Sequence, residues 1–170
     1  MTVRTILRFP DHRLRVNAER VAVFDEDLCS LAADLLDTLR AASAIGITAP
    51  HVGVLKRLVV IEIADVDGVR TYVNPQIVWA STDMIRHEEG SVSMPGVTEE
   101  IERHACVRMC YQDLSGVEKV EEADGLLCGC LQHEVDQLDG IFWIYRLSRL
   151  KRDRVVKRFD KAQCTQASGD

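Results

Sequence analysis

Residues 131–140 read LQHEVDQLDG, and this segment constrains the fold and the chemistry of the chain more than any other. His133 and Glu134 begin an H-E-x-x-H pattern, but Gln137 stands where the second histidine would be. Residues four apart on an α-helix lie on one face, so in the complete pattern two imidazoles bind one metal ion beside a catalytic glutamate. The segment therefore predicts either an altered metal site or a His-Glu pair with a structural role.

The length and composition are those of a soluble globular protein. A length of 170 residues predicts a single domain spanning 1–170, and 46% apolar with 28% charged residues is ordinary for a soluble protein. The formal net charge of -6 argues against DNA binding. There is neither an apolar run long enough to span a membrane nor an N-terminal signal sequence, so we expect a cytoplasmic protein whose six cysteines are reduced thiols.

Two helices stand out from their apolar spacing. Residues 26–41 carry a single apolar stripe, with Asp25 as a plausible N-cap. Residues 123–138 carry apolar side chains around nearly the whole circumference, which predicts a central, buried helix. The polar side chains of the opening segment lie on this second helix. We therefore expect them to be at least partly buried and to need hydrogen-bond partners.

The remaining elements are short strands and a basic tail. Val- and Ile-rich runs predict strands at 57–64, 71–73, 76–79 and 105–111, with a hairpin partner at 117–120. Residues 88–97, EEGSVSMPGV, lie between these strands and bear glycine, proline and two adjacent acids. Residues 146–161 hold eight Lys or Arg against two acids, beside a thin apolar stripe of Val155, Val156 and Phe159. Residues 165–170 read as frayed.

Three segments in order, GITAPHVG, EEGSVSMPG and QHEVDQLDG, resemble the peptide deformylase family. The corresponding family segments read approximately GxGLAAPQ, EGCLS and QHExDHLxG. The likeness covers most of the chain, beginning with FPDHRL at residues 9–14. It implies an α+β fold in which short, mostly antiparallel strands surround a central helix carrying H-E-x-x-Q, with a further helix at the C-terminus.

The family removes the formyl group from N-terminal formylmethionine, using iron, zinc or nickel. Carried over by position, the resemblance makes His133 a metal ligand and Glu134 the catalytic acid/base. Ser91 stands at the position of the ligand cysteine and Gln137 at that of the second ligand histidine. His51 replaces a glutamine that helps to hold the formyl oxygen in the family, so we take it as a second catalytic candidate.

These substitutions weaken the expected metal site. A serine hydroxyl is a poor donor at neutral pH, and a glutamine carbonyl suits hard cations such as magnesium or calcium. A catalytic metal lowers the pKa of its water from about 15.7 to about 7, worth on the order of 11–12 kcal/mol. We therefore expect a deformylase-like protein with little or no activity, and either no metal or a weakly held divalent ion.

Two alternatives stay open at this level. A working amidohydrolase with altered ligands could use His51, His133 and Cys130 as a relocated metal set. Otherwise Cys130 lines the pocket and His51 bonds Glu89 or Glu134. The second alternative is a non-catalytic module that binds peptide N-termini. The resemblance places its substrate-binding residues at or near Ile45, Gly46, Glu89, Leu126, Gly129 and Cys130.

The resemblance also names partners. The expected ligand is an N-terminal formyl-Met peptide or nascent chain. Some family members dock on the ribosome through a basic tail, and residues 146–161 have the charge for such a contact.

Overall fold

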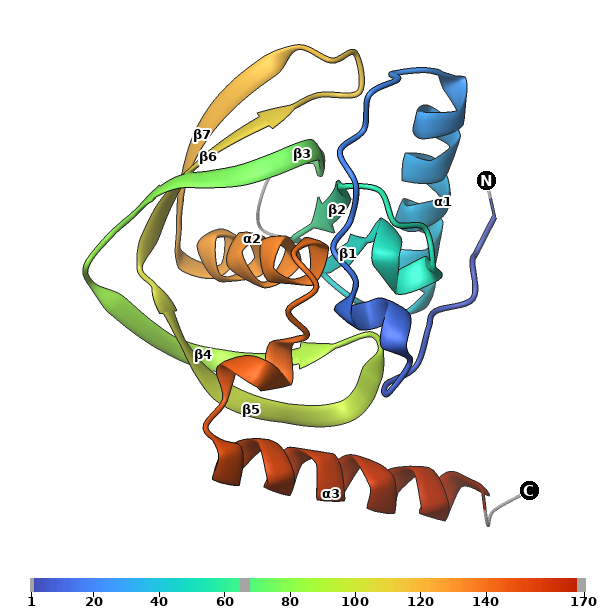
Figure 1. Cartoon of the computed structure of the whole chain (residues 1–170), viewed down its shortest axis with the longest axis vertical. Coiled ribbons are helices and arrows are strands. Elements are labelled where there is room, and N and C mark those ends of the chain that lie inside the picture. Colours follow the sequence, from blue (N-terminus) through green and yellow to red (C-terminus); the bar gives the residue numbers. More distant parts are fainter. Residues whose placement is uncertain (1, 65–67, 168–170) are drawn as a thin grey trace.

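A computed structural model describes residues 2–64 and 68–167, with side chains described as far as residue 165 (Figure 1). Two antiparallel sheets and three α-helices make up the fold, which confirms the predicted α+β class. One sheet has five strands in the order β1-β2-β3-β6-β7, and the other is the β4-β5 hairpin. The strands are β1 (Gly46–Thr48), β2 (Leu58–Glu62), β3 (Val69–Ala80), β4 (Met84–Ser91), β5 (Met94–His104), β6 (Cys106–Gln112) and β7 (Glu118–Asp124).

The helix α1 (Glu26–Ala41) has the predicted bounds. Asp25 caps it, because the carboxylate accepts a hydrogen bond from the Leu28 backbone N–H at 3.0 Å. The apolar stripe is buried against β1 and β2, as the pattern predicted. The short 3₁₀ helices η1 (His12–Arg15), η2 (Ala49–Val52) and η3 (Trp143–Arg146) complete the connections.

The central helix α2 (Gly125–Leu138) lies between the two sheets in Figure 1. It begins two residues later than predicted because β7 continues to Asp124. Four polar residues of this helix are buried, as expected: Gln132, Glu134, Asp136 and Gln137. The prediction of apolar burial on all sides is wrong at the N-terminal end, where Leu126 is 57% exposed.

The single strand β3 replaces the two separate strands that were predicted at 71–73 and 76–79. The chain continues through a bulge, where the register with β6 shifts between Val73 and Gln76 and Asn74 has a φ of 53°. The buried Asn74 amide accepts from the Val21 N–H at 2.8 Å, and it donates to the Val21 carbonyl at 2.9 Å and to Gln112 at 2.8 Å. The Asn74 side chain therefore makes hydrogen bonds at a point where the bulge interrupts the backbone pairing of the two strands.

The β4-β5 hairpin is the largest departure from the sequence-based prediction. The sequence pattern assigned no strand to residues 88–97, but they fall mostly in these two strands and close a tight turn, with Ser91 paired to Met94. The outer face is charged: Arg86 opposes Glu102 across the strands. The inner face buries Met94, Val97 and Ile101.

The helix α3 (Arg149–Ala167) packs against β5, below the hairpin in Figure 1. Val155 and Phe159 are buried there, which confirms the predicted stripe. Arg146, the first residue of the basic tail, lies in η3 and precedes the helix. Basic side chains such as Arg154 and Lys157 are exposed. Docking of this helix on the ribosome stays a prediction. No helix in the described residues is long and apolar enough to cross a membrane.

We expect Asn74→Ala to lower the free energy of unfolding by about 3 kcal/mol, because it leaves buried partners at Val21 and Gln112 unsatisfied in a left-handed conformation. Asn74→Gly should cost about 1 kcal/mol less, since glycine accepts that φ. Urea unfolding measures both. The exposed Gln76→Ala on the same strand is the control and should stay within about 0.5 kcal/mol of wild type.

Candidate active site

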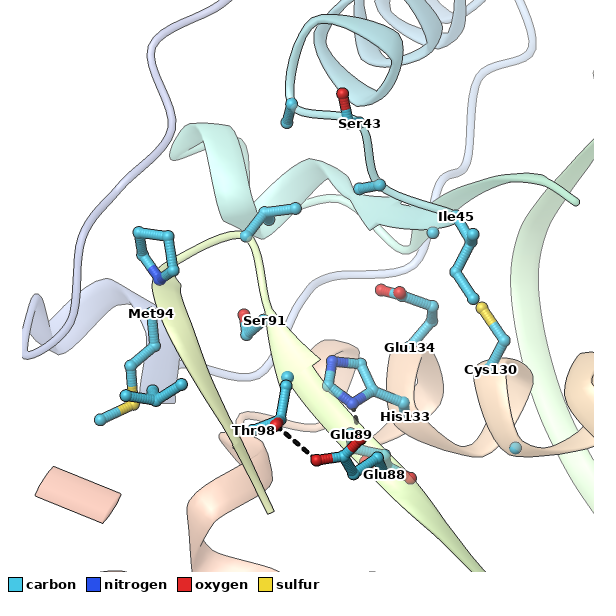
Figure 2. Close-up of a pocket in the computed structure, with 18 of the residues that line it drawn as sticks. Ser43, Ile45, Glu88, Glu89, Ser91, Met94, Thr98, Cys130, His133 and Glu134 are labelled. Carbon is cyan, nitrogen blue, oxygen red and sulfur yellow. Dashed lines mark hydrogen bonds and ion pairs between the residues drawn. The ribbon is translucent and has the colours of Figure 1, made fainter. Parts of the chain in front are cut away.

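A cavity of about 460 Å³ lies between β1, the β4-β5 hairpin and residues 126–134 of α2 (Figure 2). It contains every predicted site residue but one: Ile45, Gly46, His51, Glu89, Ser91, Leu126, Gly129, Cys130, His133 and Glu134. The exception is Gln137, which is buried on α2 but does not line the cavity. Residues from three sequence segments therefore meet around one space.

Two glycines allow the surrounding elements to approach α2. A Cβ atom at Gly46 would overlap the Glu134 carboxylate and would lie 2.8 Å from Cys130 Sγ. A Cβ atom at Gly129 would lie 2.5 Å from the His87 ring. A side chain at either position would displace the Glu134, Cys130 or His87 side chain, so the present arrangement of these groups around the cavity depends on glycine at both.

Glu134 is a buried carboxyl group of the cavity with a raised pKa. Its side chain points into the space in Figure 2, it is only 3% exposed, and Oε2 has no hydrogen-bond partner among the described residues. Burial raises the pKa of Glu134 to about 7, although the nearby His133 opposes the shift. The carboxyl group is therefore present in both protonation states near neutral pH.

His133 is held from below by Glu89. Nδ1 of the ring lies 2.9 Å from Glu89 Oε2, and the other ring nitrogen faces the cavity in Figure 2. Burial lowers the pKa of His133, but the bond to Glu89 and the charge of Glu134 outweigh it, and the pKa is raised overall. The histidine is thus oriented by an ion pair beneath it.

Glu89 belongs to a buried network centred on Arg103. The guanidinium donates to Glu89 at 2.7 and 2.9 Å and to Asp136 of α2 at 2.5 Å, and Asp136 also accepts from Arg146. Burial alone would raise the pKa of Glu89, but the bonds from Arg103 and His133 hold it far below its usual range. Sequence reasoning missed Arg103 and Asp136; the only signal was a charged residue at a buried position of α2.

His51 corrects the expectation that it would bond Glu89 or Glu134. Its Nδ1 instead accepts from the Thr48 backbone N–H at 3.0 Å and lies 2.9 Å from Thr48 Oγ1. Because a backbone N–H can only donate, Nδ1 is unprotonated and the neutral ring carries its hydrogen on Nε2. Burial lowers the pKa of His51 to about 3, and Nε2 has no partner among the described residues.

The donors needed for a transition-metal site are not assembled. Ser91 Oγ accepts from the Ser93 backbone N–H at 3.2 Å, and the Gln137 amide donates to the Leu14 carbonyl at 2.8 Å. Within residues 2–64 and 68–167, no three His, Cys, Asp or Glu side chains are placed to hold a metal ion. The relocated set of His51, Cys130 and His133 is therefore not formed, and the residues present do not fit iron, zinc or nickel.

Comparisons with known proteins confirm the resemblance. The family described as Polypeptide deformylase matches residues 3–153. A "Peptide deformylase-like" protein of Brucella melitensis is 62% identical, covering 96% of this chain and 99% of that protein. A "Peptide deformylase" of Afipia carboxidovorans is 42% identical, with 95% and 96% covered. A crystal structure of a peptide deformylase from Legionella pneumophila superposes with a TM-score of 0.93 at 38% identity, covering 99% of this chain and 100% of that chain.

Arg103→Met should lower the free energy of unfolding by about 3–5 kcal/mol, because it leaves the buried carboxylates of Glu89 and Asp136 without their cation. The matched control is Arg108→Met, which removes an exposed pair with Glu122 and should cost less than about 1 kcal/mol. Chemical denaturation measures both variants. Equal losses would show that the buried guanidinium has no special role.

Glu134→Gln should change how stability depends on pH. The folded pKa of Glu134 is about 7 against 4.5 for the free side chain, so its contribution is present below pH 4.5 and is lost as the pH rises through 7. The variant should therefore gain about 3 kcal/mol relative to wild type between pH 4.5 and pH 8. Thermal or urea unfolding across this range tests it, with the exposed Glu88→Gln, which should show no comparable trend, as control.

Proposed function

Because the chain belongs to the polypeptide deformylase family, we propose that it is a member with little or no deformylase activity that retains the cavity as a binding site for peptide N-termini. The proposal is based on the side chains at the three positions where the family resemblance expects metal ligands. Ser91 and Gln137 stand at positions where the family resemblance expects a thiolate and an imidazole, and His133 is the one strong metal donor of the three.

The size of the chemical barrier supports the loss of activity. Without a metal, the attacking water keeps a pKa of about 15.7, and the difference from a metal-bound water is on the order of 11–12 kcal/mol. Glu134, with a pKa of about 7, is a weak base for such a water. Good positioning of a water molecule returns only part of that difference.

The edge of the five-stranded sheet supports peptide binding. Strand β1 is one of the two edge strands of this sheet, and its first residue, Gly46, lines the cavity together with the preceding Ile45. An extended peptide can add to such an edge through main-chain hydrogen bonds, which do not depend on the side chains. Val92, Met94 and Leu126 provide apolar contacts within the same space. The cavity therefore offers both backbone pairing and a place for a first side chain.

We expect wild-type protein, purified without oxygen and supplied with Fe²⁺, Zn²⁺ or Ni²⁺, to give no ordinary turnover of formyl-Met-Ala-Ser. The double substitution Ser91→Cys with Gln137→His should bind Ni²⁺ or Zn²⁺ stoichiometrically and should release formate measurably above wild type.

The two single substitutions are the matched controls, because each supplies only one of the two donors and should hold the metal more weakly. Elemental analysis and a formate-release assay give the two readouts. Ordinary turnover by the wild-type protein would overturn the proposed loss of activity.

A further inference from the structure

Apart from its histidines, the ionisable side chains of the cavity lining are acidic or thiol groups. Among its described lining residues there are three glutamates, Glu88, Glu89 and Glu134, and no lysine or arginine. Glu89 is neutralised from outside the cavity by Arg103, and His87 and His133 are both bonded to it. Glu88 is exposed and accepts a hydrogen bond from Thr98 at 2.8 Å. Glu134 is thus the one buried carboxyl group of the lining with an oxygen still available to a ligand.

A second unpartnered group lies in the same cavity. His51 is 1% exposed, and its Nε2–H has no acceptor among the described residues because Thr48 holds the opposite side of the ring. A buried acceptor at Glu134 and a buried donor at His51 each leave a hydrogen bond unmade, which is costly in a folded protein. A ligand that satisfies both must present a donor and an acceptor.

We propose that the cavity binds the free, positively charged α-amino group of a peptide, with the ammonium on Glu134 and the first carbonyl oxygen on His51. The proposal rests on the proposed function, since it names the ligand of the same cavity. An ammonium pairs with a buried carboxylate through charge-assisted hydrogen bonds, and it brings a positive charge into a lining that has no lysine or arginine.

A formylated N-terminus fits this arrangement less well. Formylation converts the ammonium into a neutral amide, with one N–H and no charge to offset Glu134. The apolar contacts with Ile45, Val92 and Leu126 are the same for both peptides. The selectivity therefore comes from the charge on the α-nitrogen and not from the first side chain.

Calorimetric titration with three peptides tests the preference: Met-Ala-Ser, formyl-Met-Ala-Ser, and 4-(methylthio)butanoyl-Ala-Ser, which lacks only the amino group. We expect Met-Ala-Ser to bind at least about tenfold more tightly than either peptide without an N-terminal charge, equivalent to about 1.4 kcal/mol. Glu134→Gln should abolish this preference, whereas Glu88→Gln, which removes an exposed carboxylate from the same lining, should keep it.

The outcomes separate the two proposals. Equal or tighter binding of the formylated peptide by wild type, or an unchanged preference in Glu134→Gln, overturns the amino-group assignment and leaves peptide binding intact. Absence of saturable binding of all three peptides removes the peptide-binding function together with this inference. If Glu134→Gln does not fold by circular dichroism, the three-peptide comparison on the wild-type protein still decides the assignment.

Discussion

The geometry of the site depends on one buried cation, the guanidinium of Arg103. It joins the β4-β5 hairpin to α2 by bonding Glu89 on one side and Asp136 on the other. Because Glu89 in turn orients His133, the position of the imidazole depends on Arg103, which does not itself line the cavity. Removing water from these charges is expensive, and complete pairing is what makes their burial tolerable.

The sequence predicted the elements whose patterns are local. The stripe of α1 and its Asp25 cap gave the correct bounds, and the apolar content of α2 placed it at the centre of the fold. The β4-β5 hairpin escaped prediction because its outer face is charged, and cross-strand pairs such as Arg86 with Glu102 stabilise it only after the strands meet. The continuous β3 escaped for a similar reason, since the partners of Asn74 are far away in the chain.

The candidate site was also predicted only in part: its residues were identified, but the orientations of their side chains were not. Three short segments identified the residues around the cavity through their resemblance to the polypeptide deformylase family. The direction of each polar group does not follow from that resemblance. His51 turns Nδ1 back to the backbone of Thr48 instead of towards a carboxylate, and the Gln137 amide reaches the carbonyl of Leu14. Both hydrogen bonds depend on which buried partner lies nearest after the chain has folded.

In the proposed peptide complex, the length of β1 limits how many residues of the bound peptide can pair with the sheet. The strand has only three residues, Gly46–Thr48, so an added strand can form few main-chain hydrogen bonds before it leaves the sheet. In the proposed complex, the residues of a partner beyond the first two or three would make no main-chain hydrogen bonds to β1. Binding through this strand would depend little on the downstream sequence of the partner. Proteins of many different sequences would therefore bind through their N-terminal residues.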